Sequence, residues 1–292
     1  MIAAMGLFDF LKKKPAAAPA APPAPALPPL PQATAADLEP AMNAGDYAKA
    51  AAAFMQQPDS GTQGGVACTA LLLAYAERFD DAYARLKTIE APAIDVIVSG
   101  EQARLARWRD PVAAGKLSLI APTASAPMYA GLAVALHHRD AVLAAKVQAD
   151  FASVVRPVAG QITLRNGTVK PFTDLRDYDD GIGQMFELFV GNGVTYAPME
   201  LVKHIEIKAP SQFIEQLAFR VVVTTKTGEV INGFMPLLYA GSTTAGAPTI
   251  RVGRETKFDH IGSACRALGQ RDFKVNGGIM MGMQNIAAVD FA

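Results

Sequence analysis

The chain has few of the residues that usually form disulfides or metal sites, and it has no excess of charge of either sign. Its 292 residues include two cysteines, one tryptophan and four histidines, and 27 Lys and Arg side chains balance 27 Asp and Glu side chains. Cys68 and Cys265 lie far apart without a CxxC or Cys/His spacing, which fits a reducing compartment better than a disulfide framework. The balanced charge provides no basic surface for phosphate backbones, so nucleic acid is not an expected partner.

Signatures of catalysis are also missing. The sequence has no HExxH, no GxSxG elbow and no P-loop, and Gly181-x-Gly183 lacks the third glycine of a dinucleotide-binding loop. His137 and His138 would point about 100° apart on a helix, so they cannot chelate one ion together. The sequence therefore predicts a protein that is not an enzyme and that needs no cofactor or metal.

The N-terminal stretch has no apolar run long enough to span a membrane. In residues 5–14 an apolar cluster precedes a lysine run, the reverse of the order in a signal peptide. As a short amphipathic helix this segment could contact a lipid surface or a partner, and a plain unstructured tail is the alternative. Residues 15–33 are dominated by proline and alanine, so we predict a disordered tail over residues 1–33. Met1 and Met5 are both candidate starts.

Residues 34–157 are predicted to form a helical domain. Short alanine-rich amphipathic segments follow one another, and Tyr47 aligns with Phe79 at an offset of 32 residues, close to the tetratricopeptide period of about 34. A third helical pair is expected over residues 124–138 and 140–154. Such stacks leave a concave face that binds a segment of another protein, whereas a plain helical bundle would have no such groove. Pro157 cannot continue a helix, so the domain boundary is placed there.

Residues 158–292 alternate strands and turns and predict a β-rich α+β domain, so the whole chain is a multidomain α + (α+β) protein. Asn166-Gly167 is expected to form a two-residue hairpin turn in which both residues have positive φ. Further turns are predicted at residues 191–193, at Thr227-Gly228 and at Asn276-Gly277, and the terminal strand over residues 285–291.

The acidic segment 174–180 is the main candidate for a site with chemistry. Asp177-x-Asp179-Asp180-Gly181 resembles the start of a calcium loop, but position twelve falls on Leu188, where a bidentate Glu is required. We therefore favour a structural role, in which the aspartates shape a turn and pair with Arg165, Arg176 or Arg271. The alternative is a metal-dependent hydrolase that uses this acidic connector.

Residues 160–291 contain several weak motifs in a fixed order, among them Tyr196-Ala197-Pro198 and Leu238-Tyr239-Ala240-Gly241-Ser242. This order of motifs resembles the core of the ImpE family, also called TagJ or SciE. The chain departs from the expected pattern at Gln184, Tyr196, Phe219 and Leu238. The motif residues singled out as family features with a structural role are Pro171, Asp174, Asp177, Asp180, Glu187, Pro198, Gly241, Gln270 and Arg271.

The resemblance implies a cytoplasmic accessory protein of bacterial type VI secretion. As an adaptor it would bind the small, TssB-like subunit of the contractile sheath and be linked to ClpV, the ATPase that recycles the sheath. We expect it to bind an amphipathic helix in a groove between the helical domain and the sheet. The aromatic anchors, if exposed, would be Tyr47, Tyr83, Trp108 and Tyr196, and the alternative is that each is a core residue. A membrane-peripheral scaffold held by residues 5–14 is a further alternative.

Overall fold

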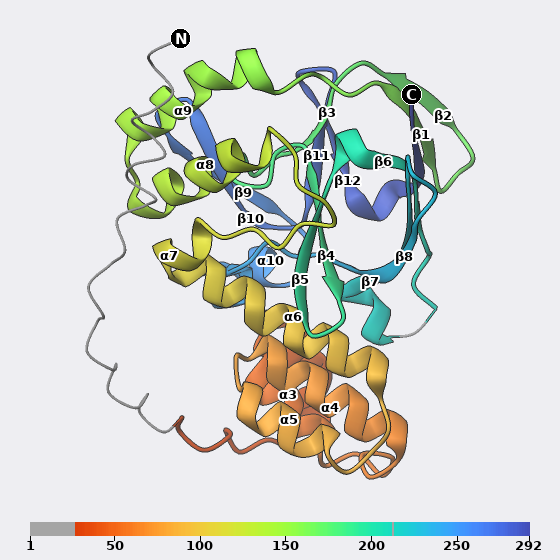
Figure 1. The fold of residues 1–292 in the computed structure, drawn as a ribbon. Coiled ribbons are helices and arrows are strands. Elements are labelled where there is room, and N and C mark those ends of the chain that lie inside the picture. The colour runs from red at the N-terminus through yellow and green to blue at the C-terminus, as the bar shows by residue number, and fades with distance from the viewer. Residues whose placement is uncertain (1–26, 212) are drawn as a thin grey trace.

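The computed structural model describes residues 27–211 and 213–292, and the segment 5–14 with most of the predicted tail lies outside this range. The first half of the described chain is helical and the second half is rich in strands (Figure 1). None of the helices in the described part has the length and apolar character that a membrane crossing requires. The α-helices are α2 (Leu38–Ala44), α3 (Tyr47–Phe54), α4 (Gln63–Tyr75), α5 (Phe79–Leu86), α6 (Pro92–Arg109), α7 (Pro111–Ala114), α8 (Ala126–His138), α9 (Ala141–Val154) and α10 (Pro248–Arg251).

Local side-chain chemistry explains where these helices begin and end. The carboxylates of Asp46 and Asp140 accept hydrogen bonds from the first backbone N–H groups of α3 and α9, and Thr62 does the same for α4. Gly45 ends α2 in the left-handed conformation, with a φ of 64°. The two aromatic residues of the predicted repeat, Tyr47 and Phe79, each open the first helix of a helical pair.

The strands form three antiparallel sheets. The largest has eight strands in the order β2-β1-β13-β6-β7-β8-β4-β5, so the C-terminal strand β13 lies between β1 and β6. A second sheet pairs β9 with β10, and a third has the order β12-β11-β3. The strands are β1 (Gly160–Leu164), β2 (Val169–Phe172), β3 (Leu175–Asp177), β4 (Met185–Val190), β5 (Gly193–Pro198), β6 (Val202–Ile207), β7 (Ala218–Thr225), β8 (Val230–Pro236), β9 (Thr256–Ile261), β10 (Ala264–Gly269), β11 (Asp272–Val275), β12 (Ile279–Gly282) and β13 (Ile286–Phe291). Short 3-10 turns are η1 (Ala35–Asp37), η2 (Met199–Leu201), η3 (Phe213–Gln216), η4 (Ser242–Thr244) and η5 (Met283–Asn285).

This arrangement confirms the predicted fold class, a helical region followed by an antiparallel β-rich region. The predicted hairpins are present, but one turn has a different conformation. In the β1–β2 turn only Gly167 has a positive φ, of 82°, whereas in the β11–β12 turn both Asn276 and Gly277 do. The β1–β2 connection is four residues long, and loops of this length do not require the two-residue mirror-image turn in which both residues have positive φ.

Helix α6 joins the two halves of the molecule. Its side chains Ile94, Ile97 and Val98 share one apolar core with Phe189 of β4 and Leu238, which follows β8. Gly100 allows the close approach, because a Cβ there would lie 2.3 Å from the ring of Phe189. Figure 1 shows α3, α4 and α5 gathered at one end of the molecule and α6 running from them along β4 and β5. A second core lies between the eight-stranded and three-stranded sheets, and a third under α8 and α9.

Candidate functional site

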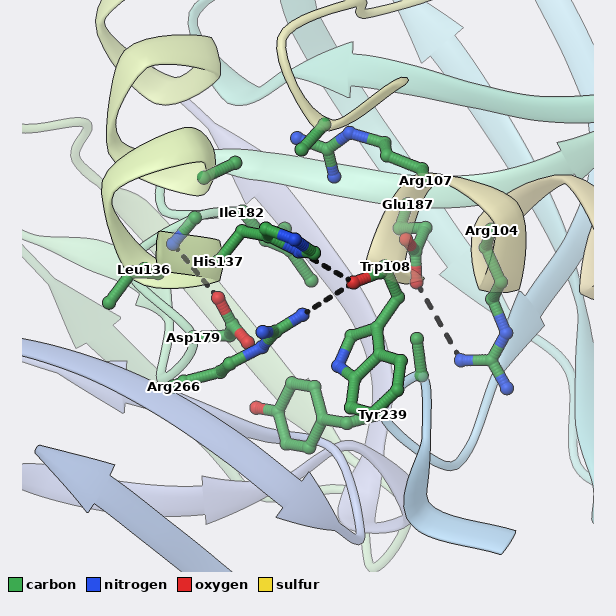
Figure 2. Close-up of a pocket in the computed structure, with 14 residues that line it drawn as sticks. Arg104, Arg107, Trp108, Leu136, His137, Asp179, Ile182, Glu187, Tyr239 and Arg266 are labelled. Carbon is green, nitrogen blue, oxygen red and sulfur yellow. Dashed lines mark hydrogen bonds and ion pairs between the residues drawn. The ribbon is translucent and has the colours of Figure 1, made fainter. Parts of the chain in front are cut away.

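The junction of α6 with the sheets is filled rather than open. We expected a groove for a partner helix between the helical domain and the sheet. A cavity of about 360 Å³ lies between α8, α9 and residues 174–184. Where α6 meets the sheets, the described residues line a smaller cavity, of about 50 Å³ (Figure 2). Its walls come from α6, α7, α8, the β3–β4 loop, β4, the segment after β8 and β10. A volume of this size is far below the pockets of several hundred Å³ that hold larger ligands, so no helix can enter the cavity at α6.

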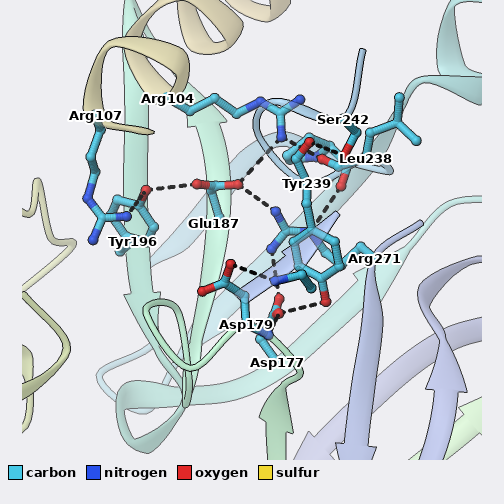
Figure 3. Close-up of polar contacts among 12 residues, drawn as sticks. Arg104, Arg107, Asp177, Asp179, Glu187, Tyr196, Leu238, Tyr239, Ser242 and Arg271 are labelled. Carbon is cyan, nitrogen blue, oxygen red and sulfur yellow. Dashed lines mark hydrogen bonds and ion pairs between the residues drawn. The ribbon is translucent and has the colours of Figure 1, made fainter. Parts of the chain in front are cut away.

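Beside this cavity, Arg271 is the centre of a buried ionic cluster. Its side chain is 0% exposed, and its guanidinium donates to the Asp177 carboxylate at 2.9 Å and to the Glu187 carboxylate at 2.5 Å. Its Nε atom also donates to the backbone oxygen of Pro236 at 3.1 Å. The three charged residues come from β3, β4 and the β10–β11 connection, so the cluster ties three parts of the β-rich region together (Figure 3).

A second buried arginine, Arg104 of α6, extends the cluster into the helical region. Its Nε atom donates to Glu101 at 2.6 Å, and its Nη1 atom donates to the backbone oxygen of Leu238 at 2.5 Å. The same Nη1 lies 3.9 Å from the Glu187 carboxylate. Because both arginines face Glu187, this carboxylate connects the helical region electrostatically to the sheet (Figure 3).

Two tyrosines complete the hydrogen bonding. Tyr196 donates its hydroxyl to Glu187 at 2.8 Å and accepts from Arg107 at 2.8 Å. Tyr239 donates to Asp177 at 2.8 Å and accepts from the backbone N–H of Asp272 at 3.1 Å. Burial raises the pKa of both tyrosines, so their hydroxyls stay protonated and act as donors.

The two carboxylates that share Arg271 differ in their pKa. Burial acts to raise the pKa of Glu187, but Arg271 and Arg104 outweigh burial and hold it below the ordinary value. Burial, together with the nearby Asp179 carboxylate, raises the pKa of Asp177 to about 7 against the opposing effect of Arg271. The difference follows from the neighbours: Glu187 faces two guanidinium groups, whereas Asp177 faces one guanidinium and a second carboxylate.

The rest of the acidic connector shapes a loop. Asp177 and Asp179 each accept from a backbone N–H two residues further on, and Asp180 accepts from the backbone N–H of Cys265 at 2.7 Å. Asp174 lies 3.7 Å from Arg176. The expected pairings with Arg176 and Arg271 are present, whereas Arg165 instead donates to backbone oxygens of Ile207, Lys208 and Gln284. In the described part of the chain, no three His, Cys, Asp or Glu side chains are grouped so as to hold a metal ion.

Two of the four candidate aromatic anchors are interior residues. Tyr47 is 3% exposed and donates to the backbone oxygen of Arg251, and Tyr196 is 1% exposed within the ionic cluster. Trp108 is half-buried beside the cavity, with the Arg266 guanidinium 4.8 Å from its ring centre. Only Tyr83 lies in an open groove. Tyr47 and Tyr196 are therefore not exposed on the surface as an anchor would have to be, and they are core residues.

The groove at Tyr83 lies between α5 and α6 and has a volume of about 950 Å³. Tyr83, Leu86 and Ile89 provide apolar surface, and the Tyr83 hydroxyl donates to Gln102 at 3.0 Å. The other side chains that line it are mostly acidic and exposed, with one lysine; the charged set is Asp80, Lys87, Glu90 and Asp95. The groove thus offers apolar surface within a negatively charged rim.

The remaining family-motif residues have local structural environments. Pro171 lies exposed on the edge strand β2, where a missing N–H is tolerated, and Pro198 is buried at the end of β5. Gly241 has a φ of 81°, and a Cβ there would lie 2.4 Å from the Trp108 ring. Gln270 donates to Asp272 at 3.4 Å beside Arg271.

Sequence reasoning missed the buried pair of Glu101 and Arg104. The signal is the spacing of the apolar residues in α6: Ile94, Ile97, Val98 and Leu105 lie on the helix face to which positions 101 and 104 also belong. A charged pair at i and i+3 on the apolar face of a helix predicts a buried ion pair with partners on the surface that the helix covers.

Together, the fold and the site define a protein with a helical region packed on an antiparallel β-rich region through a buried ionic cluster. Residues 169–290 match the family model described as ImpE protein. Over 108 residues the chain is 27% identical to the type VI secretion system accessory component TagJ of Pseudomonas aeruginosa, a match that covers 37% of this chain and 37% of that protein. These two matches show that the β-rich part of the chain is similar to ImpE proteins, and that the aligned stretch spans little more than a third of the TagJ relative.

A solved structure shows the same fold over most of the chain. The crystal structure of protein VPA1032 from Vibrio parahaemolyticus superposes with a TM-score of 0.71, covering 88% of this chain and 97% of that chain at 15% sequence identity. The likeness therefore includes the helical region, which the ImpE match over residues 169–290 does not reach.

Proposed function

We propose that this protein is a non-enzymatic accessory protein of a bacterial type VI secretion system that binds a partner segment in the groove between α5 and α6. The family supports the secretion role, because the TagJ relative is named an accessory component of that system. The groove supports the binding role, because it combines the aromatic side chain of Tyr83 with an open apolar floor. The groove lies wholly within the proposed helical domain, residues 34–157. The proposed β-rich domain, residues 158–292, packs against α6 through β4 and β5.

The charges of the groove indicate the kind of partner. Three exposed carboxylates and one lysine line it, so a segment with basic side chains beside an apolar stripe would be complementary. An amphipathic helix presents such a stripe through residues spaced three and four apart. We propose that this helix belongs to the small sheath subunit, that the complex acts in the cytoplasm, and that it is linked to ClpV-driven recycling of the sheath.

The ionic cluster supports the non-enzymatic part of the proposal. The carboxylates of the acidic connector are occupied by Arg271, by tyrosine hydroxyls and by backbone N–H groups. A carboxylate that is already paired in this way is not free to act as a general base or to bind a divalent ion.

The direct test is a fluorescence anisotropy titration of the labelled N-terminal peptide of the small sheath subunit with the full chain. We expect saturable binding by the wild type and at least about tenfold weaker binding by Tyr83→Ala and by Asp95→Lys, since removal of one aromatic anchor typically costs more than about 1.4 kcal/mol. Thermal unfolding should shift by less than about 4 °C in both variants, because Asp95 is exposed and Tyr83 is only partly buried at the edge of a core.

Matched controls are Glu229→Lys, which reverses an exposed charge in the β7–β8 turn outside the groove, and Tyr178→Ala, which removes a half-buried tyrosine from the β3–β4 loop. Both should bind the peptide like the wild type. Absence of peptide binding by the wild type would refute the sheath subunit as partner, and unchanged binding by Tyr83→Ala and Asp95→Lys would refute the groove.

A further inference from the structure

The cavity at the end of α6 is lined by more hydrogen-bond donors than the protein itself satisfies. Four side-chain nitrogens of its lining residues are buried without a partner: Nη2 of Arg104, Nε and Nη2 of Arg107, and Nε1 of Trp108. The Arg104 side chain is 1% exposed, so water outside the protein cannot satisfy it. All four atoms are donors only, and a buried donor without an acceptor is costly.

The carboxylates around the cavity do not meet this demand. The two oxygens of Glu187 accept from Tyr196 and Arg271, and those of Asp179 accept from the backbone N–H groups of Gly181 and Ala267. In the described part of the chain, neither Arg107 nor Arg266 forms an ion pair within 4.0 Å; instead, each stacks on an aromatic ring, Arg107 on Tyr196 and Arg266 on Trp108. The walls therefore carry guanidinium charge without a direct carboxylate partner (Figure 2).

The size of the cavity limits what can enter. A single water needs about 10–15 Å³ of such space, and the cavity provides about 50 Å³. This is room for a few oxygen-sized atoms, which corresponds to one carboxylate or one tetrahedral oxyanion. An oxyanion matches these donors better than water does, because it only accepts, whereas each water also brings two hydrogens that need acceptors of their own.

We infer that this cavity is a binding site for one small oxyanion of the carboxylate or phosphate type, held by the Arg107 guanidinium and the indole N–H of Trp108. Guanidinium groups match such ions, because their planar N–H pairs donate to two oxygens at once. The bound ion would occupy the junction between the helical and β-rich regions and would stabilise their packing, independently of partner binding in the α5–α6 groove.

Isothermal titration of the full chain with inorganic phosphate and with acetate tests the inference, with chloride at equal ionic strength as the comparison. We expect saturable binding of one oxyanion per chain and no comparable binding of chloride. Comparison of the phosphate and acetate titrations shows whether the site prefers a phosphate or a carboxylate. Arg107→Gln should weaken binding about tenfold, the effect of losing one charged hydrogen bond.

Arg85→Gln, which removes an exposed arginine of α5 outside the cavity, should bind like the wild type. Trp108→Phe keeps the ring and removes only the indole donor, so it provides the test if Arg107→Gln does not fold. Lack of saturable binding by the wild type, a stoichiometry above one, or equal affinity of the wild type and the cavity variant would overturn the inference and leave buried water as the occupant.

Discussion

Replacement of Arg271 by alanine leaves two buried carboxylates without their shared partner. Asp177 and Glu187 are 1% and 3% exposed, so solvent cannot replace the guanidinium. Breaking a buried pair from one side typically costs about 3–5 kcal/mol, and here one arginine serves two carboxylates. Since the whole folding free energy of a domain is about 5–15 kcal/mol, Arg271→Ala should lose at least about a fifth of the stability.

Urea unfolding at pH 8 measures this loss, and the single tryptophan, Trp108, reports on the junction by fluorescence. Arg176→Ala is the matched control, because its ion pair with Asp174 is 3.7 Å long, the arginine side chain is 39% exposed, and such pairs contribute about 0–1 kcal/mol. A loss below about 1 kcal/mol in Arg271→Ala would refute the central role of the cluster.

The same variant has a pH dependence with a definite sign. In the wild type Arg271 and Arg104 hold the pKa of Glu187 below its ordinary value, so Glu187 stabilises the fold above that value and loses this effect as the pH falls. Without Arg271 the buried Asp177 and Glu187 can become neutral by binding protons. The deficit of Arg271→Ala should therefore shrink as the pH is lowered, and Arg271→Met combined with Asp177→Asn and Glu187→Gln should recover most of the loss at pH 8.

Two further outcomes are expected from the packing of α6 and from Asp177. Gly100→Ala should destabilise the fold by about 1–3 kcal/mol, because its Cβ would lie 2.3 Å from Phe189. Gly64→Ala is the control: its Cβ would meet nothing within 4 Å, so the stability in urea should be unchanged or slightly higher. Equal effects of the two substitutions would contradict the close packing of α6. The pKa of Asp177 is about 7 in the folded chain and about 3.9 in the unfolded chain, so between these two pH values folding is accompanied by proton binding. The stability advantage of the wild type over Asp177→Asn should therefore narrow as the pH rises from about 4 to about 7. A widening advantage in urea unfolding over this range would contradict the shift.

Much of the local structure was predictable because its causes are local. The turns at Thr227-Gly228 and Asn276-Gly277 and the α8–α9 pair over residues 126–154 follow from glycine placement and apolar periodicity. The pairing of Asp177 with Arg271 was among the alternatives named from the sequence, because a dense acidic segment requires cations once it is buried.

The rest depends on contacts between residues distant in sequence. The insertion of β13 between β1 and β6 is decided by pairing across more than a hundred residues, and the alternation of side chains along a strand does not identify its neighbour. The β9–β10 hairpin was missed, because charged and apolar residues in residues 256–269 follow no clear alternation. The burial of Tyr47 and Tyr196 depends on what covers them, namely α10 with the segment after it and the packing of α6 on β5.

The most direct test of the adaptor role is site-specific photo-crosslinking in the presence of the small sheath subunit. A photoreactive phenylalanine analogue is placed at position 83 in the α5–α6 groove, or at position 178 in the β3–β4 loop as the control. The account predicts a crosslink to the N-terminal helix of the sheath subunit from position 83 and none from position 178. Equal crosslinking from both positions, or none from position 83, would contradict it.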